Sequence, residues 1–392
     1  MSSRRRVAVV GLGVLSTAGT GIEDYWRGLN GAPPQGERRI PEFDPTEWYE
    51  NPKEARRADR SQQFAMATAV MAMADAGELA GDPARHGVIY ATGVGGLATF
   101  EEQVKVWMEK GARRVSPFMI PMLMPNAAGA AISMTFGLQG PNETITTACA
   151  ASTHSIGNAA RLIQSGRCDV VVTGGCEAAM TPVGVAGFAN MTALSSTGRS
   201  MPFDRDRDGF MMAEAAATLV LEEWDSATAR GAHIYGEIMG SASNADAHHI
   251  TAPSPGGEGA IRCMQLAIED AGIAAADIAH INAHGTSTPL NDAAEAIAID
   301  KLFGSPGPLV TSTKGITGHG LGAAGALEAT AVLLAMAHRK IPPTAGFTNP
   351  DPELPEINLV HGEAADWEPG PSLSNSFGFG GHNGCLVIGP AV

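Results

Sequence analysis

The chain has 392 residues, of which 44% are hydrophobic and 17% are charged, and it contains 48 glycines and 25 prolines. This composition is ordinary for a folded protein and excludes a disordered tail, a coiled coil and a collagen-like repeat. The 26 basic side chains are outnumbered by 41 acidic ones, and the net charge of −15 argues against broad binding to nucleic acid or anionic membranes. The length favours two domains or two fused halves.

The cysteines and one long uncharged stretch indicate the cellular compartment of the chain and whether it enters a membrane. Five cysteines are too few, and odd in number, for a disulfide framework, so we expect reduced thiols in the cytoplasm. Residues 115–142 carry no charge, but four prolines within them exclude a straight membrane-spanning helix of about 20 residues. We predict that this stretch is protein interior or a subunit interface, and that the chain does not bind membranes.

Short β-branched runs alternate along the chain with longer alanine-rich runs, a pattern typical of α/β proteins with buried strands. Strands are expected at residues 7–10, 88–92, 143–147, 170–173, 218–221, 234–239, 279–283, 309–313 and 385–388. Helices are expected at residues 61–76, 151–164, 259–271, 289–302 and 323–339. A strand, turn and long helix near residue 149 have a counterpart near residue 319, which predicts two closely packed halves, 1–240 and 241–392.

Cys149 lies where the strand expected at 143–147 gives way to a helix. A helix N-terminus stabilises a thiolate, and a sharp strand-to-helix turn exposes its side chain as a nucleophile elbow does. The alternative is an inert buried cysteine, which is the commoner environment of this residue.

Two histidines occupy similar junctions. His284 and His319 each follow an expected strand, precede a helix and have glycine neighbours, which permit close approach by a substrate. Strand ends are where open α/β sheets build their sites. A lone histidine is more often structural, but a cysteine and two histidines at three such junctions predict a reactive centre. The adjacent His248 and His249 lack partners at metal-ligand spacing and favour a polar loop.

Five segments together resemble the β-ketoacyl-[acyl carrier protein] synthases of the thiolase superfamily, in particular the type II elongating condensing enzymes. They are residues 147–152, 202–210, 282–289, 314–320 and 375–383, and the resemblance covers nearly the whole chain. It implies a five-layered αβαβα duplication, usually assembled as a homodimer. The resemblance also implies that the substrates are acyl groups carried on acyl carrier protein.

The resemblance also implies a mechanism. Cys149, His284 and His319 match the catalytic triad, and the backbone N–H groups of Cys149 and Phe379 match the oxyanion hole. Cys149 is expected to accept an acyl chain, and the two histidines to assist decarboxylation of malonyl-carrier protein. A Claisen condensation then extends the chain by two carbons. No cofactor beyond the carrier's phosphopantetheine arm is implied, and no catalytic metal.

Supporting roles follow from the same match. Lys314 supplies positive charge beside the second histidine, Thr286 and Thr288 bind the pantetheine arm, and Phe379 also gates the acyl pocket. Acyl-chain and substrate contacts are expected from Val94, Met119, Phe188 and Glu328, with Met119 reaching across a dimer. A structural cation is expected near Asn282, Glu328, Ser374 and Asn375. Docking of the acidic carrier protein is expected at Lys53, Arg56, Arg57, Arg113 and Arg114, where Arg56 and Arg60 would share a helical face.

Two departures from the family pattern keep alternatives open. The segment 194–203 is several residues shorter than usual, and residues 212–217 replace a glycine-rich stretch. The chain therefore also fits a ketosynthase subunit of a type II polyketide or polyene synthase, paired with a chain-length factor in a heterodimer. A cysteine hydrolase is the rival enzyme class, since His284 follows Cys149 by 135 residues, but its cysteine motif is absent. A carrier-binding scaffold is the non-enzyme alternative.

Overall fold

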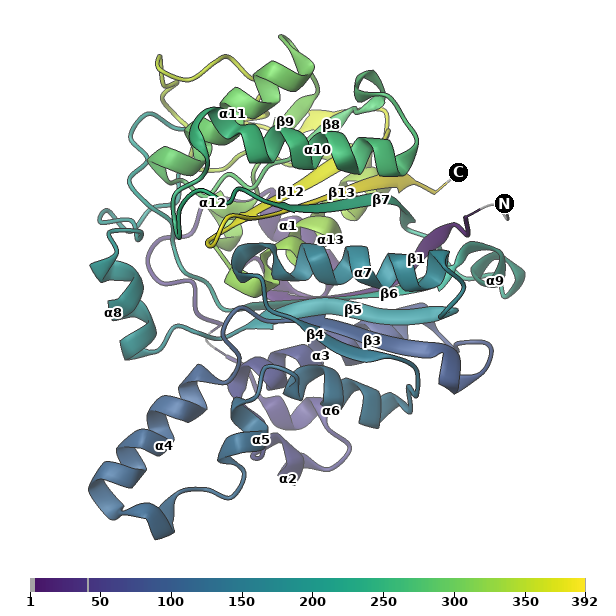
Figure 1. Ribbon diagram of the computed structural model, residues 1–392, viewed down its shortest axis with the longest axis vertical. Helices are drawn as coiled ribbons and strands as arrows, with labels where there is room; N and C mark the ends of the chain where they lie inside the picture. The colour runs from purple at the N-terminus through teal and green to yellow at the C-terminus, as the bar shows by residue number, and fades with distance from the viewer. Residues whose placement is uncertain (1–3, 41, 392) are drawn as a thin grey trace.

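The structure is a computed structural model that describes residues 4–40 and 42–391. Its helices and strands form five alternating layers, helix–sheet–helix–sheet–helix, stacked from bottom to top in Figure 1. The lower sheet contains, in spatial order, β4 (Asn142–Ile145), β3 (His86–Ala91), β5 (Val170–Glu177), β6 (Ala215–Glu223) and β1 (Val7–Ser16). The upper sheet contains β7 (Gly236–Ala245), β13 (His382–Pro390), β12 (Ser372–Gly378), β8 (His280–Asn282) and β9 (Leu309–Thr311).

The two sheets repeat one strand pattern. In each, three parallel strands are followed by two antiparallel ones, so that β4, β3, β5, β6 and β1 correspond to β9, β8, β12, β13 and β7. The sheets join through a short antiparallel pairing of β1 with β7, at Ala8 with Glu237 and Val9 with Gly236. Three small strands lie outside this pattern: β2 (Gly19–Thr20), β10 (Lys340–Ile341) and β11 (Ala365–Asp366).

The central layer holds α7 (Ala151–Gln164) and α13 (Ala324–His338), enclosed between the sheets. Apart from Glu328, Thr330 and the terminal His338, α13 is apolar, as expected for a helix buried all round. Residues 321–338 are the one described stretch with the length and composition of a membrane span, and most of it is buried inside the protein. Its apolar character is therefore explained by its place in the core.

The remaining helices cover the outer faces and edges. α3 (Arg60–Ala76) packs on β1 and β6, and α10 (Glu258–Ala271) packs on β7 and β13. The others are α1 (Ile22–Leu29), α2 (Pro52–Ala55), α4 (Leu97–Lys110), α5 (Met119–Leu123), α6 (Ala127–Phe136), α8 (Pro182–Asn190), α9 (Trp224–Ala229), α11 (Pro289–Phe303) and α12 (Lys314–Thr317). In Figure 1, α4 extends away from the layered body at the lower left.

The sequence predicted the central elements better than the peripheral ones. Every expected strand and helix overlaps an observed element of the same type, and α7 has the predicted bounds. β12 was missed because its polar run Ser372–Gly378 has no β-branched residue, although it is buried beside β13 and β8. The expected division at residue 240 falls inside β7, whose whole length belongs to the upper sheet.

Candidate active site

Cys149 lies on a tight turn between β4 and α7, as the sequence predicted. Ala148, directly before it, adopts a left-handed conformation with φ of 51°, which costs an L-residue about 1–2 kcal/mol. The turn is held from the other half of the protein, because β12 approaches so closely that a Cβ on Gly378 would lie 3.1 Å from the Cys149 nitrogen. The side chain is only 6% exposed, yet it forms part of a pocket wall.

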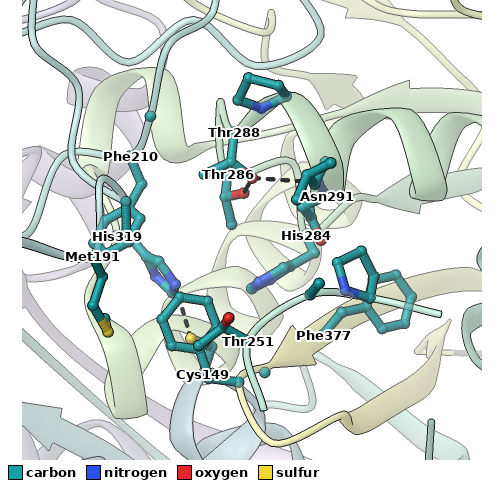
Figure 2. A pocket seen from close by; sticks show the side chains of 18 of the residues that line it. Cys149, Met191, Phe210, Thr251, His284, Thr286, Thr288, Asn291, His319 and Phe377 are labelled. Atoms are coloured by element: carbon teal, nitrogen blue, oxygen red, sulfur yellow. Dashed lines mark hydrogen bonds between the residues drawn. The ribbon is translucent and has the colours of Figure 1, made fainter. Parts of the chain in front are cut away.

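His319 contacts this thiol directly. Its Nε2 lies 3.1 Å from Cys149 Sγ, the pair joined by a dashed line in Figure 2. Backbone hydrogen bonds to the segment just before β6 fix the histidine: its N–H donates to the Met211 oxygen at 2.7 Å, and its oxygen accepts from the Ala213 N–H at 3.0 Å. Gly318, with φ of 68°, allows this fit, since a Cβ there would lie 3.0 Å from the Met211 oxygen.

His284 completes the group from the end of β8. Its ring centroid lies 5.4 Å from that of His319 at an interplanar angle of 82°, and ligand atoms of Cys149, His284 and His319 all lie within 4.8 Å of one another. The loop is fixed by Glu295 on α11, whose two carboxylate oxygens accept from the N–H groups of His284 and Gly285 at 2.8 Å each. The three residues singled out from the sequence therefore meet in one buried cluster.

Lys314 lies behind this cluster as a fully buried cation. Its Nζ donates to the His284 carbonyl oxygen at 2.5 Å, lies 3.4 Å from His284 Nδ1 and forms an ion pair with Glu328. Glu328, expected from the resemblance to contact substrate, does not line the pocket beside Cys149 and instead pairs with Lys314; its contact with substrate stays a prediction. The pKa of the Glu328 carboxyl is raised to about 7, because burial disfavours its charged form more than the attraction of Lys314 favours it.

Burial also sets the protonation of the reactive groups. It raises the pKa of Cys149 to about 11, against the opposing effects of the Phe379 backbone, Lys314 and the residue's own N–H. Burial thus opposes the thiolate that the helix N-terminus favours. Burial, followed by Lys314, lowers the pKa of His319 and of His284 well below the ordinary histidine value, so both are neutral. The thiol thus donates its hydrogen bond to His319.

These groups open onto a pocket of about 390 Å³. Thr286 and Thr288, whose hydroxyls lie 2.9 Å apart, line it on one side, and Phe188 and Phe379 line it on another (Figure 2 labels the threonines). Val94 and Met119, predicted to line the acyl tunnel, are absent from this pocket wall, and Val94 is 41% exposed on the surface. Their role in lining an acyl tunnel, with Met119 reaching across a dimer, stays a prediction.

Two parts of the chain match known domains. Residues 33–227 match Beta-ketoacyl synthase, N-terminal domain, and residues 235–348 match Beta-ketoacyl synthase, C-terminal domain. The chain belongs to the β-ketoacyl synthase family. This confirms the resemblance drawn from the five sequence segments.

Similar proteins span the full length of this synthase. The 3-oxoacyl-[acyl-carrier-protein] synthase 2 of Synechocystis sp. is 44% identical over 411 aligned residues, covering 98% of both chains. A solved ishigamide ketosynthase/chain length factor structure has a TM-score of 0.92 and 33% identity, and the match covers all of both chains. A type II polyketide synthase acyl-carrier protein solved in complex with its ketosynthase gives a TM-score of 0.91 and 29% identity, covering 99% of this chain and 100% of that one.

The synthase also has buried polar atoms at the expected cation position. Both side-chain polar atoms of Asn282, Ser374 Oγ and Glu328 Oε2 are buried without a hydrogen-bond partner among the described residues. Asn282 and Ser374 are paired residues on β8 and β12. Such orphaned oxygens fit a hard cation, which prefers oxygen ligands. Asn375 fits less well, because its side chain already donates to Glu295 and accepts from Cys385.

The expected docking residues are exposed but are arranged differently from the prediction. α2 ends at Ala55 and α3 begins at Arg60, so Arg56 and Arg60 do not share a helical face. Arg60 instead pairs with the buried Glu214, at 2.8 Å. The five expected docking residues lie on the surface without a carboxylate within ion-pair distance in the described chain: Lys53, Arg56, Arg57, Arg113 and Arg114.

Arg57 connects the two parts of this basic surface. Its guanidinium lies over the Phe118 ring, 4.7 Å from the centroid. Phe118 immediately precedes α5, a few residues after Arg113 and Arg114. The basic residues that follow α2 and those that follow α4 therefore belong to adjoining segments of the surface.

Exposed apolar side chains gather on α4, α5 and α6 and the segments between them. The exposed fractions of Trp107, Met108 and Met134 are 58%, 74% and 78%. Phe100, Phe118, Ile120 and Met124 are exposed in the same part of the chain. This is the region in which the uncharged stretch 115–142 had predicted interior or an interface, and exposed apolar residues in such number are typical of an interface.

Sequence reasoning missed two buried carboxylates that hold the site together. Glu295 fixes the His284 loop, as described above. Glu177, at the end of β5, accepts from the N–H groups of Gly93 at 2.7 Å and Gly322 at 3.1 Å, joining the loop after β3 to the turn after His319. The sequence offers a sign that Glu177 is special, because it is the only charged residue between positions 170 and 198. Nothing in the sequence distinguishes Glu295 from other acidic residues on a helix.

Proposed function

We propose that this synthase is a competent condensing enzyme, which extends an acyl chain held on Cys149 by two carbons from malonyl-acyl carrier protein. The observation that carries the proposal is the 3.1 Å contact of a buried thiol with a neutral histidine, beside a second neutral histidine on the same pocket. A carrier-binding scaffold has no use for this geometry. The cysteine hydrolase alternative pairs Cys149 with His284, but the thiol contacts His319, and a hydrolase built on that pair leaves His284 and Lys314 without a role.

Acyl transfer comes first. His319 Nε2 takes the Cys149 proton as Sγ attacks the acyl thioester, and the proton then passes to the departing carrier thiol. The N–H groups of Cys149 and Phe379 stabilise the oxyanion of the tetrahedral intermediate, a contribution of about 10²–10³ in rate per donor. Because burial disfavours a resting thiolate, the transfer of the proton to His319 is part of the reaction itself.

Decarboxylation and condensation follow in the same pocket. Once Cys149 is acylated it no longer donates to His319, whose proton moves from Nδ1 to Nε2; neutral His284 and His319 then both donate N–H hydrogen bonds to the malonyl thioester oxygen, where negative charge develops as CO₂ leaves. The carbanion attacks the acyl group on Cys149 and expels the thiolate, which takes up a proton from solvent. Lys314 holds His284 through its carbonyl oxygen and Nδ1. Thr286 and Thr288 bind the pantetheine arm, and a cation held by Asn282, Ser374 and Glu328 would neutralise buried charge behind the site.

The proposal includes a dimer built on the exposed apolar residues of α4, α5 and α6. Val94 and Met119 then contact an acyl chain only once a partner subunit closes the tunnel around Phe188. The second candidate function, a polyketide ketosynthase paired with a chain-length factor, is favoured by the likeness to a solved pair of that kind. The 44% identity to a synthase of the first kind favours the condensing enzyme with an identical partner. The thiolase-like duplication and a cytoplasmic location belong to either version.

Acylation tests the proposed nucleophile. After incubation with acyl-acyl carrier protein, intact-protein mass spectrometry should show an acyl adduct on the wild type and none on Cys149→Ala. Cys168→Ala is the matched control, since Cys168 is also a buried free thiol at the other end of α7, and it should acylate normally. An adduct that persists in Cys149→Ala would show that Cys149 is not the nucleophile.

We further propose that the carrier protein docks on the basic surface around Arg57. Arg56→Glu combined with Arg114→Glu should raise the apparent KM for acyl carrier protein severalfold, more strongly at low salt. Turnover of a short acyl-pantetheine mimic should stay unchanged, and so should both assays in Arg167→Glu, an exposed arginine on the turn after α7. Equal losses with carrier and mimic would assign the surface a structural role instead.

A further inference from the structure

The three reactive side chains also form a set of metal donors. Cys149, His284 and His319 offer one sulfur and two nitrogens, all within 4.8 Å of one another, with Sγ and His319 Nε2 only 3.1 Å apart. Zinc bonds of about 2.3 Å to sulfur and about 2.0–2.1 Å to nitrogen place the ligands of one tetrahedral ion roughly 3.3–3.8 Å apart. Small side-chain rotations therefore bring the three donors to bonding distance of one ion.

The nitrogen donors already face the thiol side of the pocket. His319 Nε2 lies 3.1 Å from Cys149 Sγ, within reach of an ion bound to that sulfur. His284 Nδ1 faces Lys314, which leaves Nε2 for the pocket, and a shift of the ring proton from Nε2 to Nδ1 frees the Nε2 lone pair for the metal. The pocket supplies the fourth, open position of the ion to water or to a small anion.

A divalent ion in this site must overcome the repulsion of Lys314. That buried cation lies beside His284 Nδ1 and is partly offset by its ion pair with Glu328. Because the thiol proton leaves as the metal–sulfur bond forms, the site gains one unit of positive charge and not two. The three donors therefore have to supply the binding.

We propose that the resting synthase binds one thiophilic divalent ion, Zn²⁺ or Cd²⁺, through Cys149, His284 and His319, and that this ion blocks acylation. One thiol proton leaves to solvent as the metal–sulfur bond forms, with no change of oxidation state. The ion is an inhibitor and not a cofactor, because the acyl group and the ion need the same sulfur. Binding rests on the donor geometry alone, whereas the block rests on the proposed function.

This site differs from the cation position near Asn282. That position offers oxygens, which suit hard ions, whereas sulfur and imidazole select zinc-like ions. Sodium, potassium and magnesium should therefore neither occupy the Cys149 site nor compete for it. The difference gives the test an internal control.

Cadmium titration of the resting protein, without any carrier, tests the proposal. The ultraviolet charge-transfer band of a cadmium–thiolate bond should grow to one equivalent, and zinc should displace it. Cys149→Ser should abolish the band, and His284→Ala should raise the dissociation constant at least tenfold, since even outer-shell partners of bound metals contribute 10–100-fold. Cys168→Ser, which alters a buried thiol outside the site, should match the wild type.

Alkylation gives a second reading that does not depend on variants folding correctly. Zinc should slow iodoacetamide modification of wild-type Cys149, and EDTA should restore the rate. A band that survives in Cys149→Ser, or one lost equally in Cys168→Ser, overturns the proposal, as does alkylation that zinc leaves unchanged. If metal binds as expected while acyl carrier protein fails to acylate Cys149, the site stands and the proposed function is what fails.

Discussion

Replacing Glu295 by alanine should separate the two half-reactions. Its carboxylate accepts the N–H groups of His284 and Gly285 at 2.8 Å each, in a fully buried setting. Alanine leaves both backbone donors without a partner, and each buried orphan costs about 1–3 kcal/mol. The Asn375 amide, which also donates to Glu295, keeps its contact with Met264 Sδ. The free energy of unfolding should therefore fall by about 2–6 kcal/mol. Because the loop carries His284, and a shift of about 1 Å can cost 10²-fold in rate, malonyl decarboxylation should fall by about that factor.

Cys149 lies on a different element, so its reaction with iodoacetamide should remain within about twofold of the wild type. Urea denaturation gives the stability, and release of CO₂ from malonyl-carrier protein gives the decarboxylation rate. Asp300→Ala is the matched control on α11, because Asp300 is partly exposed and far from the loop; it should change stability by no more than about 0.5 kcal/mol. A Glu295→Ala protein with wild-type decarboxylation would refute the reasoning, as would equal losses in decarboxylation and alkylation.

Three further predictions follow from buried groups. Burial lowers the pKa of His280 from an ordinary 6.5 to about 3. The folded protein therefore loses several kcal/mol of stability as the pH falls from about 6.5 to 3, because protonation favours the unfolded chain. In His280→Leu the free energy of unfolding should depend less on pH in that window, as measured by acid denaturation. Gly322→Ala, whose Cβ would lie 2.1 Å from the Gly93 nitrogen, should destabilise by at least about 1–3 kcal/mol in urea, whereas Gly187→Ala, with open space around it, should not. Lys314→Met should cost about 3–5 kcal/mol by leaving Glu328 unpaired, and adding Glu328→Leu should restore stability but not condensation.

The sequence predicts that Cys149, His284 and His319 lie together because each carries a local signal. Each lies between a β-branched run and a helical run, and the structure brings the three side chains into one cluster. Val94 and Met119 have only the family resemblance behind them. They do not line the pocket beside Cys149, and their acyl contacts stay a prediction.

The expected Arg56–Arg60 helix failed for a local reason. Asp59 caps α3, its carboxylate accepting from the Ser61 N–H while Gln62 completes the capping box. That Asp-x-x-Gln pattern is a helix start signal, and it outweighs the turn-by-turn spacing of the basic residues. Glu295 and Glu177 belong to another class, because a buried carboxylate that fixes a loop is recognised only when its backbone partners are brought to it by the fold.

The matching strand patterns of the two sheets have a consequence for how such a protein could arise or be redesigned. Cys149 follows β4 and His319 follows β9, which occupy equivalent places in the two sheets, yet one junction carries a thiol and the other an imidazole. Two copies of the first half would bring two thiols together, and two copies of the second would bring two imidazoles together. The strand pattern is therefore repeated while the side chains at equivalent junctions differ, and a chimera keeps the thiol–imidazole pair only if it takes one half of each kind.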